Sequence, residues 1–387
     1  MLRFLQVIPP QLSIPLFEVC QHLELPPVAT YAALCLWNYR PIFADEPADN
    51  LDNVACINTF TGSLDEQWFY LISVAIEARG APSIPLMLHA ISAARSGNEE
   101  VVVDCLQRFA EILDTLGTIL QRMYENCDAH VFYHRIRPYL AGSKNMGEAG
   151  LPRGLLYDDG SHNNEYRQYG GGSNAQSSLI QFFDIVLGIE HRPTGVGRQE
   201  GSDDEEGQQA KSRNSFMHEM REYMPGSHRR FLQHVDTIAN IREFVESRPS
   251  NTALSCAYDG CLAMLRALRD KHIQMVSRYI IVKSREARQQ QSHPADINGS
   301  GSKNSAKKLL RGTGGTALIP FLKQARDETE EPTVNEWARR LLRHAPVESG
   351  SAATLSKVGE NLDGHLEIVG LAGTWRADES EGGICHW

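Results

Sequence analysis

Apolar residues recur at helical spacing along most of this chain. Across Val101–Arg122 they fall three or four positions apart, which is the period of an amphipathic α-helix. The same test predicts further helices at Leu71–Ala94, Leu179–Ile189, Phe231–Val245 and Thr252–Val282. No alternation of apolar and polar residues is convincing as a strand series, and no internal repeat is evident. We therefore expect an all-α fold built around one large helical domain.

Polar, glycine-rich segments divide the helical pattern. One expected insert, residues 192–214, contains the acidic run Asp203–Glu206, and a second, residues 285–310, is rich in Gln, Gly and Ser. Such composition cannot bury a core and is typical of solvated loops. The end of the chain, Glu367–Trp387, is read as short paired strands. The expected regions are a small N-terminal domain over residues 1–60, a large helical domain over 61–330 and a C-terminal extension over 331–387.

Composition narrows the class of protein. The chain has 387 residues, of which 42% are hydrophobic and 22% charged, so it has enough apolar material for a substantial core. Its net charge of -10 argues against a general affinity for nucleic acid or for an anionic membrane, since both need a positive surface. No membrane span and no signal peptide are expected from the sequence. The eight cysteines form no CxxC pair, which favours a reduced, cytoplasmic compartment.

His272 lies on the apolar stripe of the helix expected at Thr252–Val282. Leu265 and Leu268 precede it by seven and four positions, and Met275 and Tyr279 follow it by three and seven. A histidine on a buried face either hydrogen-bonds through both ring nitrogens or binds a ligand. Periodicity alone favours the hydrogen-bonded core histidine and leaves a metal or haem ligand open.

A multi-ligand metal site is not favoured around this histidine. The chain has no HExxH or CxxC motif. His130 and His134 have the spacing of two zinc ligands on a helix, but only Cys127 and Asp128 stand nearby, so a chance surface pair is the better interpretation. A single axial histidine on a wide apolar wall is instead what a haem requires.

Several motifs of one known family occur in order between about Leu23 and about Arg326. They are Phe132–Leu140, Gly171–Ser178, Asp184 with Leu187–Gly188, Arg221 with Tyr223–Pro225 and His228–Arg229, Leu268–Val276 with Tyr279–Ile280, and Gly312–Thr316. Together they resemble the indoleamine 2,3-dioxygenase family. This resemblance implies a haem-dependent dioxygenase that opens the indole ring of tryptophan. Members have a fuller N-terminal domain, so we expect the small domain here to be truncated.

The resemblance implies a set of cofactor residues. The cofactor would be haem b, with His272 as the proximal iron ligand. Arg269 would lie near a propionate, and the remaining haem contacts would be Ser173, Asn174 and Val276.

The resemblance also implies a substrate site. Arg137 would pair with the substrate carboxylate, for which a planar guanidinium suits two parallel hydrogen bonds. Ser73 would lie on the distal side near oxygen, and Thr313 beside the substrate ammonium. The indole would pack against the aromatic side chains of Tyr31, Phe69 and Phe132. Because glycines permit backbone change, Gly312–Thr316 would form a lid, and we expect residues 285–315 to be disordered without substrate.

Each of these residues also has an ordinary structural interpretation. Taken singly, Arg137 is interpreted as a surface arginine and Phe132 as a core aromatic residue. Ser73 is interpreted as a small helix residue and Gly312–Thr316 as a linker. Their joint occurrence favours the enzyme. It would be a monomer that uses L-tryptophan and O2 to make N-formylkynurenine, in the kynurenine pathway that leads to NAD. The alternatives are an oxygen-binding haem protein and a catalytically inactive relative.

Overall fold

The computed structural model describes most of the chain, in two separate units, Met1–Leu342 and Arg343–Trp387. The described residues are 6–144, 146–161, 164–194, 215–291, 312–313, 317–336, 338–340, 367–370 and 373–376. In the second unit β6 (Glu367–Gly370) pairs antiparallel with β7 (Gly373–Arg376), as the sequence predicted. Most of the expected insert at 192–214, the part of the second insert after Gln291, and residues 314–316 of the expected lid lie outside the described residues.

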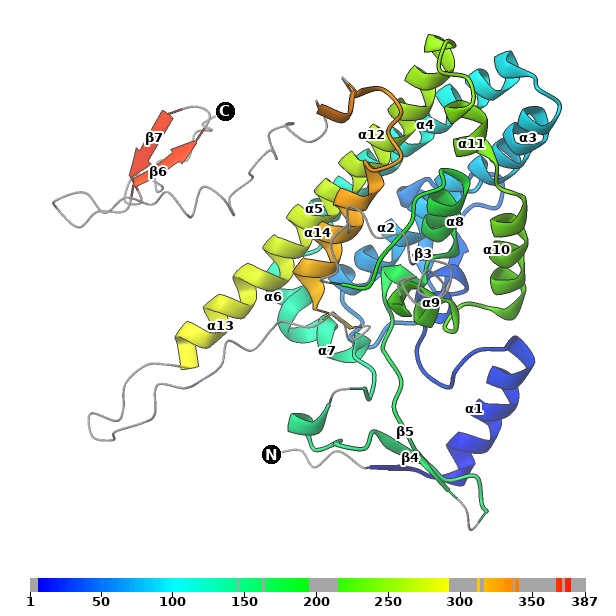
Figure 1. The fold of residues 1–387 in the computed structure, drawn as a ribbon. Coiled ribbons are helices and arrows are strands. Elements are labelled where there is room, and N and C mark those ends of the chain that lie inside the picture. The colour runs from blue at the N-terminus through cyan, green and yellow to red at the C-terminus, as the bar shows by residue number, and fades with distance from the viewer. Residues whose placement is uncertain are drawn as a thin grey trace, which may run out of the picture. The chain divides into compact units, whose positions relative to one another are not determined.

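Helices dominate the first unit, which confirms the predicted all-α class (Figure 1). The longer ones are α1 (Pro10–Leu23), α2 (Leu64–Gly80), α3 (Ser83–Arg95), α4 (Glu99–Gln121), α8 (Ser178–Val186), α10 (Gly226–Ile238), α12 (Thr252–Val276), α13 (Lys283–Gln291) and α14 (Leu318–Thr329). The shorter ones are α5 (Met123–Asn126), α6 (Ala129–Val131), α7 (Arg137–Leu140), α9 (Ser215–Arg221) and α11 (Ile241–Glu246). The first residues of the expected insert at 285–310 are therefore helical, since α13 includes them.

The two longest helices, α4 and α12, pack side by side and form the centre of the core (Figure 1). Each begins at an asparagine whose side chain accepts a hydrogen bond from a free backbone N–H, Asn98 from Val101 and Asn251 from Leu254. Apolar side chains then follow at helical spacing and are removed from solvent. On α4 they are Val102, Leu106, Phe109, Leu113 and Leu116, and on α12 they are Leu254, Tyr258, Cys261, Leu262 and Leu265.

Two predicted helices are each divided in the structure. The range Leu71–Ala94 contains the junction between α2 and α3, where Pro82 interrupts the helix because it has no N–H to donate. This stretch has the length and apolar composition of a membrane-crossing helix, but half of its apolar window is buried inside the unit, as in a core helix. The range Phe231–Val245 is divided between α10 and α11 at Asn240, whose φ of -148° is not helical.

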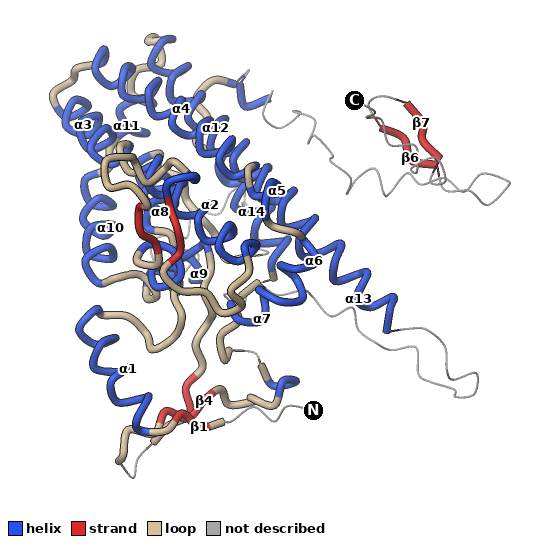
Figure 2. Tube along the Cα trace, turned by 180° about the vertical axis from the view of Figure 1, so that it is seen from behind, coloured by secondary structure: helices blue, strands red, loops and turns tan. Residues whose placement is uncertain are grey.

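Short strands, which the sequence analysis did not predict, lie outside the helical core. β1 (Val7–Ile8) pairs parallel with β4 (Leu155–Tyr157), which pairs antiparallel with β5 (Tyr166–Arg167). These strands lie beside α1, at the end of the unit opposite α3 (Figure 2). A second pair joins β2 (Tyr39–Pro41) to β3 (Val54–Cys56). Strands of two or three residues are too short to show an alternating pattern.

The described residues include three π-helical segments, and each adjoins a predicted site residue. They are Ala32–Leu36, Phe132–Ile136 and Ser277–Val282. The last of them means that the predicted helix Thr252–Val282 is α12 followed by a wider π turn. π turns widen the helix by one residue and are frequent at functional sites.

Candidate active site

His272 lies on α12, one turn before the π-helical segment Ser277–Val282. Its ring is half-buried, and among the described residues it makes no hydrogen bond or ion pair. Burial, together with the positive charge of Arg269, lowers the pKa of the imidazole to about 4. The ring is therefore neutral at pH 7, with a nitrogen lone pair free to bind a metal ion.

His272 offers a single ligand. Within the described ranges, no three His, Cys, Asp or Glu side chains gather as a metal site. His130 and His134 do come together, with ring centroids 4.4 Å apart, but both are exposed on the surface. One neutral histidine on an apolar helix fits a haem, in which the porphyrin supplies the other iron ligands.

Three aromatic rings from separate elements form a wall beyond the end of α12. Phe132, which is 6% exposed, lies 4.8 Å from Phe69 of α2 and 5.7 Å from Tyr279, measured between ring centroids. The Tyr279 hydroxyl donates to the Cys127 carbonyl at 2.5 Å, which fixes the ring. Tyr279 follows His272 by seven residues, or about 10 Å along a helix. The predicted pair Phe69 and Phe132 is thus brought together, on a wall that includes Tyr279.

Arg137 stands one π turn after Phe132. Its backbone N–H donates to the Phe132 carbonyl, an i to i+5 bond that places the two residues on successive turns of the same segment. The guanidinium is half-buried and lies 5.6 Å from the centroid of the Tyr133 ring, within cation–π range. Burial lowers the pKa of Arg137, yet a guanidinium stays charged at pH 7. A cation therefore lies in the same short segment as Phe132, and its contact with a substrate carboxylate stays a prediction.

Tyr31 and Ser73 form a buried polar cluster on the α2 side. The Ser73 hydroxyl lies near the Tyr31 hydroxyl and the Cys35 thiol, and it acts to lower the pKa of both groups against the larger effect of burial. The Tyr31 hydroxyl donates to Glu77 at 2.9 Å. Burial raises the pKa of Tyr31 well above its usual value. The structure therefore brings the predicted distal residue Ser73 close to the predicted indole contact Tyr31, and the Tyr31 hydroxyl is bound to Glu77.

Glu77 is a buried carboxyl group that sequence reasoning missed. It lies one turn after Ser73 and accepts hydrogen bonds from Tyr31 and, at 2.5 Å, from Ser177 at the start of α8. Burial raises its pKa above the usual value. The sequence feature that could have predicted this carboxyl group is its position four residues after Ser73, on the same face of a helix whose nearby residues are mostly apolar.

The Gly-rich segment lies against Tyr31 and Thr313. The Gln176 side chain donates to the Gly171 carbonyl at 2.8 Å and accepts from the Tyr31 N–H at 2.9 Å. Thr313 accepts from the Gly171 N–H at 3.0 Å and donates through its hydroxyl to the Gly172 carbonyl at 2.7 Å. A side chain at Gly171 would collide with the Leu140 carbonyl oxygen, so this approach requires glycine.

The predicted haem contacts differ from one another in burial and in hydrogen bonding. Ser173 caps a short 3₁₀ turn by accepting from the Ala175 N–H at 3.3 Å, while Asn174 is exposed. Val276 is buried one turn after His272. Arg269 donates to Asp184 at 2.5 Å and to the Ala325 carbonyl at 3.1 Å. The structure thus places Arg269 in an internal ionic network, and its contact with a propionate stays a prediction.

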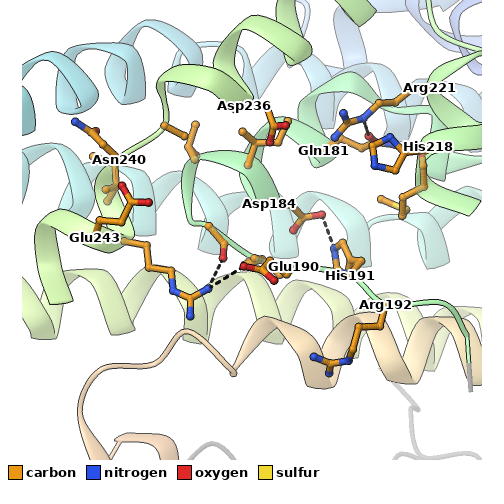
Figure 3. Close-up of a pocket in the computed structure, with 18 of the residues that line it drawn as sticks. Gln181, Asp184, Glu190, His191, Arg192, His218, Arg221, Asp236, Asn240 and Glu243 are labelled. Atoms are coloured by element: carbon orange, nitrogen blue, oxygen red, sulfur yellow. Dashed lines mark hydrogen bonds and ion pairs between the residues drawn. The ribbon is translucent and has the colours of Figure 1, made fainter. Parts of the chain in front are cut away.

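A cavity of about 990 Å³ lies beside Asp184, lined by residues from α8 to α11 (Figure 3). None of the predicted site residues lines it. Its wall carries many charged side chains, including Glu190, Arg221, Asp236 and Glu243. An aromatic substrate requires a mostly apolar wall, so the candidate active site remains the region between His272 and Arg137.

Comparison with known proteins agrees with the motifs. The family model of indoleamine 2,3-dioxygenase matches residues 3–332. An indoleamine 2,3-dioxygenase of Saccharomyces cerevisiae is 40% identical over 339 residues, which are 84% of this chain and 72% of that protein. One of Aspergillus candidus is 41% identical, covering 83% and 74%. A 6-hydroxytryptophan 2,3-dioxygenase of Fusarium equiseti is 37% identical, covering 84% and 74%. The chain therefore belongs to the indoleamine 2,3-dioxygenase family, whose members are haem-dependent dioxygenases of tryptophan-type indoles.

Proposed function

We propose that this enzyme cleaves the indole C2–C3 bond of L-tryptophan with O2 to give N-formylkynurenine. The observation that carries the proposal is the π turn in which Phe132 and Arg137 lie one turn apart. Tryptophan has a flat apolar ring at one end and a carboxylate at the other. An aromatic wall beside a half-buried guanidinium matches both ends.

The residues present fit haem b bound through His272. The imidazole is neutral and makes no hydrogen bond within the described part of the chain, and Val276 lies on the same helix face one turn later. When bound, ferrous haem supplies the activation of O2, which no side chain can provide.

The side chains supply position. Arg137 holds the carboxylate and so fixes the direction of the amino acid, while Phe69 and Phe132 hold the ring and exclude water. Holding the reacting bond in place converts an encounter of two molecules into an oriented step. Ser73 and Tyr31 carry weakly acidic hydroxyls, and that of Tyr31 already donates to Glu77, so we assign no general acid to the protein.

The cellular setting follows from the same reaction. N-formylkynurenine formation would begin tryptophan catabolism by the kynurenine pathway, toward NAD. We place the enzyme in the cytoplasm as a monomer. The described cysteines support a reducing compartment, because all of them are free thiols.

The test is product formation by the haem-loaded, reduced protein with L-tryptophan. We expect N-formylkynurenine from the wild type and a fall of about 100-fold in kcat/KM for Arg137→Ala, since a charged hydrogen-bond partner is lost. Arg135→Ala removes an exposed arginine two positions away and serves as the matched control. Equal kcat/KM in Arg137→Ala and the control would contradict the carboxylate role.

Comparing two substrates tests which indole the enzyme prefers. The Fusarium equiseti relative is named for 6-hydroxytryptophan, so both indoles are compared at equal concentration. A higher kcat/KM for L-tryptophan supports the proposal, and a higher one for 6-hydroxytryptophan overturns it. A haem spectrum with no product from either indole would favour an oxygen-binding protein instead.

A further inference from the structure

His191 lies between two buried carboxylates that come from different helices. Its Nε2 is 3.0 Å from Asp184 of α8, and its Nδ1 is 2.7 Å from Glu328 of α14. The side chains of all three residues are at most 8% exposed. Figure 3 shows the Asp184 contact at the edge of the charged cavity. No residue of the candidate active site contributes to this triad.

Two ionised carboxylates at these positions require a protonated ring. An ionised carboxylate only accepts hydrogen bonds, and a neutral imidazole has one N–H to donate, whereas an imidazolium has two. Burial by itself would lower the pKa of His191, but the charge of Asp184 and the hydrogen bonds to both carboxylates outweigh burial and raise it. The pKa values of Asp184 and Glu328 are lowered despite their own burial.

Charged groups from several helices surround His191. The groups that face it are Asp184 of α8, Arg269 of α12, Glu328 of α14 and the adjacent Arg192, with His218 and Arg221 of α9 on the wall of the same cavity. Arg269 pairs with Asp184, and Arg192 pairs with Glu331 at 2.8 Å. Loss of the proton from His191 removes a positive charge from between two buried carboxylates and one of the two N–H donors of the ring, so that Asp184 and Glu328 keep only Arg269 and Arg192 as positive partners.

Helix α14 depends on such contacts for its position. Its buried side chains are Phe321, Glu328 and Thr329, only one of which is apolar. Arg326 on α14 pairs with Asp270 on α12 at 3.1 Å. Thr313, which binds Gly171 and Gly172, stands five residues before the start of α14. Because only four residues separate Thr313 from α14, the position of α14 limits how far Thr313 can move.

We propose that His191 is a positioning residue: as an imidazolium it holds α14 against α8 and α12 and so keeps Thr313 at the substrate site. This inference rests on the proposed function, because its catalytic consequence is a lower KM for the indole substrate. The protonated ring stabilises the docked position of α14 fully at pH values below the ordinary pKa of histidine. This stabilisation is lost as the pH rises through the raised pKa of His191. Substrate affinity then falls on the alkaline side while turnover of bound substrate changes little.

The test is hydrogen–deuterium exchange of α14 in the full-length, haem-loaded protein. His191→Gln keeps a donor of similar size and removes the charge. We expect α14 amides to exchange about tenfold faster in this variant, since a charge-assisted hydrogen bond between buried groups is lost. After correction for intrinsic rates, wild-type α14 should show an alkaline step in exchange that the variant lacks. His234→Gln, an exposed histidine on α10, is the matched control.

Three further measurements keep the inference falsifiable. His191→Lys, which restores a cation, should recover most of the protection, and His191→Gln should raise KM for L-tryptophan with little change in kcat. If His191→Gln does not fold, Glu328→Gln replaces it and should move the wild-type alkaline step to lower pH. Equal α14 exchange in wild type and His191→Gln across the pH range would overturn the inference. Failure to make product would overturn the proposed function alone, because exchange is measured without turnover.

Discussion

Helix α12 is held on two sides by opposite kinds of interaction. Toward α4 it presents apolar residues such as Leu262 and Leu265, which are fully buried. Toward α14 it presents Arg266, Arg269 and Asp270, and these pair with charged or hydroxyl groups of the neighbouring helix. The first contact is maintained by removing surface from water and the second by matched charges.

The two contacts of α12 should respond differently to pH. Burial of apolar area is non-directional and does not depend on protonation, so the α4 side gives His272 a firm support under most conditions. A buried ion pair requires the right geometry and the right charge on both partners. The α14 side can therefore change with pH while the helix that carries His272 stays in place.

Removing one buried charge should produce the largest effect. Asp184→Asn leaves Arg269 without its anion and removes one of the two carboxylates that contact His191, and we expect a loss of about 3–5 kcal/mol in the free energy of unfolding. Chemical denaturation at pH 6.5 measures it. Asp327→Asn is the control, because Asp327 is 56% exposed where it pairs with Arg326. It should change stability by less than about 0.5 kcal/mol. Equal losses in the two variants would remove the distinction between the buried network and a surface pair.

A cavity on the apolar side should have a similar or slightly smaller effect. Leu265→Ala removes a side chain with 0% exposure and should cost about 2–5 kcal/mol. Leu64→Ala, at an exposed leucine on α2, should cost little. The same denaturation experiment compares them. A loss below about 1 kcal/mol in Leu265→Ala would show that the α4 contact is not tightly packed.

The fold of the apolar side could be predicted from sequence, and that of the ionic side could not. Helix α4 and the stripe around His272 follow from spacing alone, because apolar burial leaves a period in the chain. The pairing of His191 with Glu328 joins residues 137 positions apart, and Glu77 meets Ser177 across 100 positions. Charge complementarity at such separations leaves no local pattern.

The candidate site shows the same division. Motifs indicated Phe132 and Arg137, but the π turn that brings them together differs from an α turn by one residue and has no side-chain signature. Pro82 in the sequence could have predicted the break between α2 and α3. The pairing of Arg269 with Asp184 and α14 could not be predicted, because it depends on how three helices pack together.

The pH dependence of the two sides should differ. Stability from protonated His191 is present below about pH 6.5 and is lost as pH rises through its raised pKa. Stability from Asp184 and Glu328 is present above about pH 4 and is lost as pH falls through their lowered pKa values. The stability difference between wild type and Asp184→Asn should therefore be largest between those limits and smaller outside them. The difference for Leu265→Ala should stay constant, and a parallel pH profile for both variants would contradict the comparison.

The smallest expected change in stability belongs to His272→Ala in the haem-free protein. The pKa of His272 is lowered to about 4, so the unfolded chain takes up a proton before the folded one does as pH falls below about 6.5. Replacing it should leave stability nearly unchanged at pH 7.5 and raise it by about 1–2 kcal/mol at pH 5. Thermal unfolding at the two pH values measures this, with His89→Ala on the exposed side of α3 as control. The same variant should lose its Soret absorbance after haem loading, because α12 offers no second ligand at that position. Retained haem with unchanged acid stability would show that His272 is an ordinary core histidine, supported by the α4 contact but not used by the site.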